Sequence, residues 1–231
     1  MRLRNIKGSR EIIAASKYTI AQERAARTSF EERYDWSVKG HWKEVFGNDH
    51  PLYLEIGMGK GAFLMEQAVR HPEINYVGIE KYSSVLLRAV QKQDAQELPN
   101  VRLIRMEAEN INDVFAADEV DRIYLNFSDP WPKDGHASRR LTSRQFLNRY
   151  DQILREQGML EFKTDNKELF AFSLEEIDPA KWEVCMITGD LHKDPEFMKD
   201  NVMTEYEQRW SEQGKPICGL HLLHRKQEVT V

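Results

Sequence analysis

The residues best suited to chemistry lie in one stretch, residues 125–133, which reads Leu-Asn-Phe-Ser-Asp-Pro-Trp-Pro-Lys. Its first half continues a run rich in β-branched and aromatic residues, a pattern that predicts a strand. Its second half is rigid, because each proline fixes its own φ and pushes the preceding residue, Asp129 or Trp131, towards an extended conformation. A carboxylate, an indole and the Lys133 amine at the carboxyl end of a strand suit a reactive site, since open α/β sheets bind ligands there. Taken alone, the stretch fits equally well a proline-rich loop anchored by a buried Trp131.

A second candidate site is the glycine-rich turn of residues 55–61, Glu-Ile-Gly-Met-Gly-Lys-Gly. Gly57 and Gly59 let the backbone approach a ligand closely, at the point where a predicted strand passes into a helix with free N–H groups. Glu80 follows at the end of the next predicted strand, where an acid takes the ribose hydroxyls of an adenosine-containing cofactor. The turn lacks the G-x-G-x-x-G fingerprint of dinucleotide sites. Glu55 would repel a pyrophosphate, but it suits a ligand with an ammonium or sulfonium group, and S-adenosylmethionine has both.

Two further acids, Glu107 and Glu109, follow the third predicted strand and are candidates to lie near the adenine of such a cofactor. Glu109 fits almost as well the solvated start of a helix, where a carboxylate is favoured by the helix dipole. Turn glycines often serve packing only, so it is the placement of Glu80 that favours cofactor binding.

The elements that must position these residues alternate along the chain. The patterns predict strands over residues 52–57, 75–80, 101–106, 122–127 and 158–164. They predict helices over residues 62–71, 83–97, 111–115, 142–154 and 166–177. Two last strands, over 182–188 and 216–223 with a helix over 204–213 between them, are expected to close an antiparallel hairpin at one edge. This alternation predicts an α/β fold with a mostly parallel sheet and helices on both faces.

The predicted domain covers residues 49–231 and follows a basic N-terminal extension, residues 1–48, that is partly flexible and partly helical near 30–46. The whole chain of 231 residues has a net charge of −5, with 41% hydrophobic and 31% charged residues, which is ordinary for a soluble globular protein. This charge argues against a generally basic nucleic-acid binder. Basic residues nevertheless gather in the first 27 residues and between 133 and 149, so one face could still bind RNA.

The sequence has no apolar run long enough to cross a membrane and no signal-peptide pattern at its start. Cys185 and Cys218 lack metal-ligand spacing and are expected to be reduced thiols, which indicates a cytoplasmic protein. The histidines also lack convincing metal spacing, so no metal is expected.

The order of these motifs resembles that of bacterial tRNA (guanine-N7-)-methyltransferases. The motifs are the turn at 55–61, Gly-Ile-Glu at 78–80, Ser-Asp-Pro-Trp-Pro-Lys at 128–133 and Thr-Glu-Tyr-Glu at 204–207. The first two are shared by many methyltransferases, whereas the proline-rich turn, with Arg139-Arg140-Leu141 behind it, and Phe-Lys-Thr-Asp-Asn at 162–166 are specific. The likeness runs from about residue 10 to residue 220.

The resemblance implies a Rossmann-like class I methyltransferase fold with a mostly parallel seven-stranded sheet and an antiparallel edge strand. It implies S-adenosylmethionine as cofactor, bound by Glu55, Gly57, Gly59, Glu80, Lys81, Glu107, Ala108, Asn126 and Asp129. Substrate binding maps to Lys133, Asp165, Thr204, Glu205, Tyr206 and Glu207. Contact with tRNA maps to Gly135, His136, Ala137, Ser138, Arg139 and Arg140. The expected product is a guanine methylated at N7 in the variable loop of tRNA, at position 46, made by a monomer or homodimer.

Three residues depart from the family pattern. Gly135 stands where arginine is common and Ser138 where a basic residue is common, so the grip on tRNA is expected to rest more on Arg139, Arg140 and the N-terminal arm. Glu107 replaces a frequent aspartate, which changes reach rather than charge.

The chemistry of the reaction assigns roles to the acids. Guanine N7 already has a free lone pair, so no strong base is needed, and positioning supplies much of the rate. The product is cationic, and Asp129 is the candidate that stabilises the developing charge or holds the guanine N1–H and amine. Asp165 and Glu207 are candidates for the same edge of the base, although Asp165 also fits an N-cap of the following helix. Trp131 fits a stacking platform for a base as well as a plug of the sheet edge.

Two other functions stay open from sequence. The first is a methyltransferase for a small molecule or another RNA, which would keep the glycine turn. The second is a catalytically silent RNA-binding protein, which would keep only the fold. The specific proline-rich turn counts against the first alternative. The intact acids Glu55, Glu80, Asp129 and Asp165 count against the second.

Overall fold

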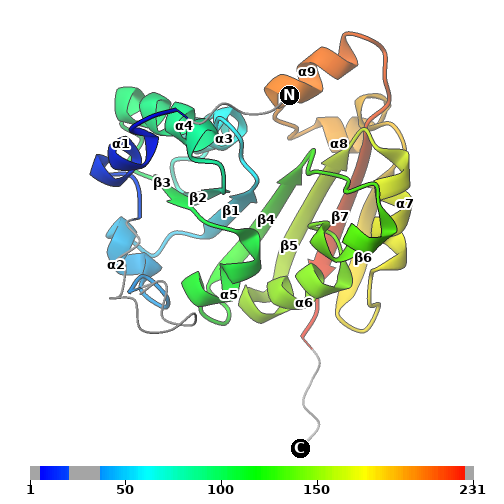
Figure 1. Ribbon diagram of the computed structural model, residues 1–231. Helices are drawn as coiled ribbons and strands as arrows, with labels where there is room; N and C mark the ends of the chain where they lie inside the picture. Colours follow the sequence, from blue (N-terminus) through cyan, green and yellow to red (C-terminus); the bar gives the residue numbers. More distant parts are fainter. Residues whose placement is uncertain (1–5, 21–36, 227–231) are drawn as a thin grey trace, which may run out of the picture.

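A seven-stranded sheet forms the centre of the computed structural model, which describes residues 6–20 and 37–226 (Figure 1). The strands are β1 (Leu52–Ile56), β2 (Asn75–Glu80), β3 (Val101–Arg105), β4 (Val120–Asn126), β5 (Leu154–Thr164), β6 (Trp182–Thr188) and β7 (Cys218–His224). They lie in the order β3-β2-β1-β4-β5-β7-β6. Strands β3, β2, β1, β4 and β5 run parallel, whereas β7 runs antiparallel to both of its neighbours. The predicted α/β class and mostly parallel sheet are therefore confirmed.

Helices cover both faces of this sheet. They are α1 (Ser9–Ala15), α2 (Trp42–Phe46), α3 (Ala62–Arg70), α4 (Ser83–Gln96), α5 (Ile111–Val114), α6 (Arg144–Ile153), α7 (Lys167–Glu175), α8 (Pro195–Met198) and α9 (Glu205–Ser211). Within the described residues, short 3-10 helices lie in the connections: η1 (Ala108–Asn110), η2 (Asp134–Arg139) and η3 (Leu191–Lys193).

The two faces have separate hydrophobic cores because side chains alternate along each strand. Along β1, Leu54 and Ile56 join the core beneath α5, α6 and α7, whereas Tyr53 packs against the core beneath α1, α3 and α4. All six residues of β2 are buried, as expected for a parallel strand covered on both sides. Two buried faces hold the sheet rigid and thus fix the positions of its strand ends.

The described part of the predicted N-terminal extension packs onto this domain. Ile13 and Tyr18 are buried, and Thr19 forms a bridge to Leu103 of β3. Trp42 stacks on Phe115 with ring centroids 5.1 Å apart, and its indole N–H donates to the carbonyl of Val114. The helix expected near residues 30–46 is found as α2, while residues 30–36 lie outside the described ranges. The division at residue 48 stays a prediction.

The last two strands form the expected antiparallel pair, and the structure adds their order. Strand β7 lies between β5 and β6, so β6 is the edge strand. Strand β5 begins at Leu154, earlier than residue 158, because Val120 of β4 pairs with Leu154 across a bulge. Both cysteines are free thiols, Cys185 exposed and Cys218 buried.

The sheet reverses its strand order between β1 and β4, the point where open α/β sheets bind ligands. The carboxyl ends of β1, β2, β3 and β4 meet at this edge, and α9 lies beyond the ends of β4 and β5 (Figure 1). Among the described helices, none is both long and apolar enough to cross a membrane. Within the same ranges, no group of His, Cys, Asp and Glu side chains is arranged to hold a metal ion.

Candidate active site

Two cavities open at the carboxyl ends of the central strands. The wide cavity, of about 600 Å³, is lined by residues that include Glu80, Lys81, Glu107, Ala108, Ser128, Asp129 and Trp131. The narrow cavity, of about 260 Å³, is lined by residues that include Glu55, Gly57, Gly59, Asn126, Thr204, Glu205 and Tyr206. Gly57 and Phe127 line both cavities, so the two adjoin. Together they bring the predicted cofactor residues to one crevice.

The glycine turn is built for close approach to a ligand. Gly57, Gly59 and Gly61 have φ values of 77°, 60° and 73°, a region that residues with a Cβ rarely adopt. An added Cβ at Gly57 or Gly59 would meet open space, so both face the cavities rather than packed side chains. At Gly61 the Cβ would lie 3.1 Å from the Cβ of Ala89 in α4, so Gly61 serves helix packing.

Glu80 is held firmly at the end of β2. Its Oε2 accepts a hydrogen bond from the Gly59 N–H at 3.2 Å, and its Oε1 accepts from the Tyr82 N–H at 2.9 Å. Burial raises the pKa of Glu80, and these backbone hydrogen bonds act against that rise. The carboxylate is thereby oriented into the wide cavity, where it can accept from hydroxyl groups.

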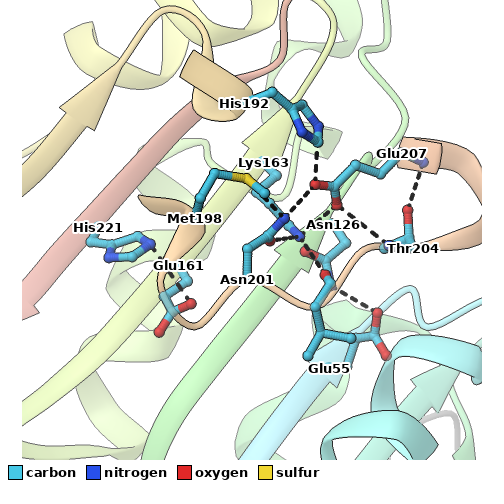
Figure 2. A network of polar contacts seen from close by, with 11 residues as sticks. Glu55, Asn126, Glu161, Lys163, His192, Met198, Asn201, Thr204, Glu207 and His221 are labelled. Carbon is cyan, nitrogen blue, oxygen red and sulfur yellow. Dashed lines mark hydrogen bonds and ion pairs between the residues drawn. The ribbon is translucent and has the colours of Figure 1, made fainter. Parts of the chain in front are cut away.

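Glu55 is the most unusual acid of the site. It is 2% exposed, and its Oε1 accepts from the Asn126 side-chain amide at 3.0 Å (Figure 2). Its Oε2 is buried and meets no hydrogen-bond partner among the described residues. Burial raises the pKa of Glu55 to about 8, against the effects of the Asn126 hydrogen bond, the positive charge of Lys163 and the backbone N–H of Leu64. An unpaired buried carboxylate oxygen facing a cavity is suited to bind a cationic ligand group.

The proline-rich turn closes the wide cavity on another side. Trp131 has a φ of 42°, in the left-handed region, so the extended conformation expected before Pro132 is wrong. Two cations lie near its ring centroid, the Arg139 guanidinium at 5.1 Å and the Lys81 amine at 5.7 Å. Arg140 donates to the carbonyls of Pro130 and Trp131 at 3.0 and 3.1 Å, and so braces the turn. Trp131 is only half-buried and lines the cavity, which favours a ligand platform over a plug of the sheet edge.

The acids around the wide cavity differ in exposure. Asp129 is exposed at the cavity wall, directly after Ser128, whose buried hydroxyl meets no partner in the described residues. Glu107 lies 3.9 Å from the Lys81 amine, at the start of η1. Both acids line the wide cavity, and the expected cofactor contacts stay a prediction. The exposed Asp129 is also placed to face a substrate.

Helix α9 forms the wall of the narrow cavity opposite the glycine turn. Thr204 caps the helix by accepting from the Glu207 N–H, while the Glu207 side chain accepts in return from the Thr204 N–H, a capping box. Tyr206 donates to Asp165 Oδ2 at 3.1 Å, and its ring lies 4.9 Å from that of Phe127. Glu205 lies within 3.3 Å of the Lys92 amine and 3.7 Å of the Lys60 amine.

Glu207 does not reach the substrate space where it was expected. Its side chain is fully buried, and its carboxylate accepts from Lys163 and from Asn201, each at 2.7 Å (Figure 2). In this arrangement Glu207 stabilises the position of α9 and does not bind the edge of a base.

The structure also shows which residue caps α7. Asn166, not Asp165, accepts from the Leu169 N–H at 2.7 Å. Asp165 therefore stays available for a ligand.

The residues expected to contact tRNA lie in η2, with Arg140 directly after it. Gly135, Ser138 and Arg139 are exposed, as is Lys133 just before η2, and Arg139 lines the wide cavity. His136 packs edge-on against Trp131. Sequence reasoning missed Lys163 and Ser128. A lysine within the apolar strand pattern Phe-Lys-Thr was the signal that could have identified the first of these, since buried lysines are rare unless paired.

Comparison with known proteins is consistent with this geometry. A family model described as "Putative methyltransferase" matches residues 49–220. The chain is 52% identical over 227 residues to a tRNA (guanine-N(7)-)-methyltransferase of Lachnoclostridium phytofermentans, covering 98% of this chain and 100% of the relative. It is 44% identical over 220 residues to the enzyme of that name from Lactococcus lactis subsp. cremoris, covering 95% and 96%. Among solved structures, the 16S rRNA methyltransferase KamB aligns with a TM-score of 0.59 at 13% identity over 90% of this chain and 99% of that one, a likeness of fold.

Proposed function

The chain belongs to the tRNA (guanine-N(7)-)-methyltransferase family, and on that premise we propose that its two adjoining cavities transfer a methyl group from S-adenosylmethionine to N7 of a guanine in tRNA. The target we propose is the variable-loop guanine at position 46. The observation that carries the proposal is the pair of acids at neighbouring strand ends, Glu55 with an unpaired buried oxygen and Glu80 oriented by two backbone N–H groups.

The residues present fit this cofactor. The unpaired Oε2 of Glu55 would accept from the ammonium group, and the turn at Gly57 and Gly59 leaves open space for the methionine part. Glu80 would accept from the ribose hydroxyls. The wide cavity beyond it, between Glu107 and Trp131, would take the adenine. When bound, S-adenosylmethionine supplies an electrophilic methyl group on a sulfonium.

The chain's own residues then have to orient the guanine and stabilise charge. Asp129 lines the wide cavity and is exposed, so its carboxylate can stabilise the positive charge that develops on the purine. Asp165 can accept from the N1–H and the exocyclic amine of guanine, and the Tyr206 hydroxyl orients its carboxylate. No general base is required at N7, since that atom carries a lone pair and no proton.

The surface beside the cavities supplies the tRNA contacts. Arg139 is exposed and lines the wide cavity, and Lys133 is exposed just before η2, while Arg140 is engaged in bracing the turn. Lysine and arginine neutralise phosphates and give binding a strong dependence on salt. Gly135 and Ser138 add no charge, so electrostatic binding of tRNA at η2 depends on Lys133 and Arg139.

Methyl transfer to defined transcripts tests the proposal. Purified protein is incubated with methyl-labelled S-adenosylmethionine and unmodified tRNA transcripts that carry either guanine or adenine at position 46. Label should enter only the guanine transcript, and borohydride–aniline treatment should then cleave it at the labelled base. Cofactor binding without transfer to any tRNA would favour a small-molecule methyltransferase or a silent RNA-binding protein. Transfer to another guanine would correct the position alone.

A further inference from the structure

Lys163 is a buried cation that the proposed chemistry does not use. It is the next-to-last residue of β5 and is 7% exposed. Its amine donates three hydrogen bonds: to Glu207 Oε2 at 2.7 Å, to Asn201 Oδ1 at 2.9 Å and to the Val202 carbonyl at 3.0 Å (Figure 2). An ammonium group has three donors, so all of them are used. These partners lie on the segment that leads into α9 and on α9 itself.

The same lysine is also linked to the cofactor acid, through a residue of the strand between them. Lys163 pairs in register with Asn126 of β4, and Asn126 donates its side-chain amide to Glu55. The positive charge of Lys163 lowers the pKa of Glu55, although burial has the larger, opposite effect. One ammonium group therefore acts on a carboxylate of the cofactor site and on a carboxylate of α9.

Helix α9 is shared by both ligands of the proposed reaction. Thr204, Glu205 and Tyr206 line the narrow cavity opposite the glycine turn, so a cofactor there would contact them. Tyr206 also holds Asp165, the acid proposed to orient the guanine. The position of the first turn of α9 thus affects both the narrow cavity and the Asp165 carboxylate proposed to bind the guanine, which together are called the two pockets below.

The contact between Lys163 and Glu207 dominates the placement of this helix. The side chains of Lys163 and Glu207 are 9% and 0% exposed, whereas those of Lys60, Lys92 and Glu205, which form the two other lysine pairs of α9 in the described ranges, are 37–56% exposed. The His192 ring, 20% exposed, also lies 3.4 Å from the Glu207 carboxylate. Exposed pairs contribute little to stability, whereas removal of one partner from a buried pair leaves an uncompensated charge. Without Lys163, the buried Glu207 carboxylate would keep the hydrogen bonds from Asn201 and the Thr204 N–H but lose the cation that compensates its charge, so the start of α9 would be held less firmly.

We propose that Lys163 is a positioning residue that holds α9 in place before either ligand binds, and that it thereby pre-forms both pockets. The proposal rests on the function proposed above. If Lys163 is lost, each ligand must order α9 by itself, so each binds more weakly, and the first ligand to bind makes it easier for the second. Loss of Lys163 should therefore lower both affinities and increase the positive coupling between them.

The test compares Lys163→Met with Lys181→Met. Lys181 also pairs with a carboxylate, Asp151, at 2.6 Å, but this pair lies at the start of β6, away from α9, so the control repeats the same chemical change elsewhere. The affinity for a tRNA transcript is measured with no cofactor and with saturating S-adenosylhomocysteine, below the unfolding temperature of each variant. Circular dichroism checks that each variant is folded.

We expect Lys163→Met to bind the transcript roughly tenfold more weakly without S-adenosylhomocysteine, and to recover much of that loss when it is added. In the wild type and in Lys181→Met, the added compound should change the affinity much less. The isosteric variant Glu207→Gln should shift in the same direction as Lys163→Met, and it replaces that variant if Lys163→Met does not fold.

Two outcomes overturn the proposal. In the first, the ratio of the tRNA affinities with and without S-adenosylhomocysteine is the same in Lys163→Met and Glu207→Gln as in the wild type. The other is an equal change in Lys181→Met, which would indicate general destabilisation. The methylation assay on the wild type separates this proposal from the proposed function. If the wild type methylates tRNA and the ratio is unchanged, only the role of Lys163 is wrong, whereas a wild type without methylation removes the basis of both.

Discussion

Asn126 donates its side-chain amide to one oxygen of the Glu55 carboxylate at 3.0 Å and leaves the other oxygen, Oε2, buried without a partner in the described residues. The amide at the end of β4 thus orients an acid at the end of β1 towards the narrow cavity. This half-satisfied carboxyl group makes cofactor binding sensitive to protons, because only its ionised form pairs with an ammonium group.

Cofactor affinity should rise with pH. Because the pKa of Glu55 is raised to about 8, it is mostly protonated at neutral pH and must release a proton when it meets an ammonium group. We expect the dissociation constant of S-adenosylhomocysteine to fall by up to about tenfold per pH unit between pH 6 and 7.5. Calorimetry in two buffers of different ionisation enthalpy should show the release of up to one proton. Glu55→Gln should bind more weakly at every pH and show no proton release.

Glu55→Gln should also stabilise the folded protein when no cofactor is bound. The pKa of Glu55 is higher in the folded state (about 8) than in the unfolded state (about 4.5), so between these values the folded state holds the extra proton and stability falls as pH rises. Glutamine imitates the protonated form and avoids this loss. The melting temperature of Glu55→Gln should therefore exceed that of the wild type by more at pH 8 than at pH 5. A constant difference across this range would contradict the assignment.

Asp129 should affect turnover more than folding. It is exposed and lines the wide cavity, so Asp129→Asn should leave the melting temperature nearly unchanged. Loss of a carboxylate that stabilises the developing charge should lower kcat by about 100-fold or more. Single-turnover transfer of labelled methyl groups measures this effect directly. A variant with a normal rate would show that Asp129 stabilises no charge in the transition state.

Asp165 and Asn166 should separate function from stability, although they are neighbours. Asn166→Ala removes the cap of α7 and should lower the free energy of unfolding by about 1 kcal/mol in urea titrations. Asp165→Asn should leave this free energy nearly unchanged, because Asp165 is not the cap, but should lower kcat/KM for tRNA. The reverse pattern would mean that Asp165 has the structural role and would remove it from the guanine pocket.

Lys133 should contribute to tRNA binding through charge alone. It is exposed at the N-cap of η2, so Lys133→Ala should weaken binding to all transcripts alike. The slope of log affinity against log salt concentration should become shallower by about 0.7–0.9 if one phosphate contact is lost. The control is Arg155→Ala. Arg155 lies at the amino end of β5, away from the cavities at the carboxyl ends of the strands, so this variant should keep the wild-type slope. Affinity for S-adenosylhomocysteine should be the same in all three proteins.

Much of the site could be predicted because its parts are local in sequence. The apolar run of β2 ends at Glu80, and Glu55 lies near the end of β1, just before the glycines of the first turn. The sequence pattern therefore placed Glu55 and Glu80 at the ends of neighbouring strands. The register between β1 and β2 then brings Glu55 opposite Gly78, two residues before Glu80. Parallel pairing of consecutive strands is the common outcome for such alternation, and it fixed the location of the crevice.

The remaining features depend on contacts between residues far apart in the chain. Lys163 and Glu207 are separated by 44 positions, and no local pattern relates a lysine in a strand to a glutamate in a helix. The capping box of Thr204 and Glu207 is a local arrangement, but no local pattern shows that its glutamate is buried against a lysine. Asp165 and Asn166 are both good cap residues, so only the geometry of the turn decides between them.

The insertion of β7 between β5 and β6 has a consequence for how the chain folds. Strand β6 pairs with β7 alone among the described strands, so it has no place in the sheet until residues 218–224 have been synthesised. The parallel half of the sheet, from β3 to β5, can form earlier, and it then exposes the unpaired edge of β5. During synthesis on the ribosome, that open edge is the part of the molecule most prone to wrong pairing with another chain.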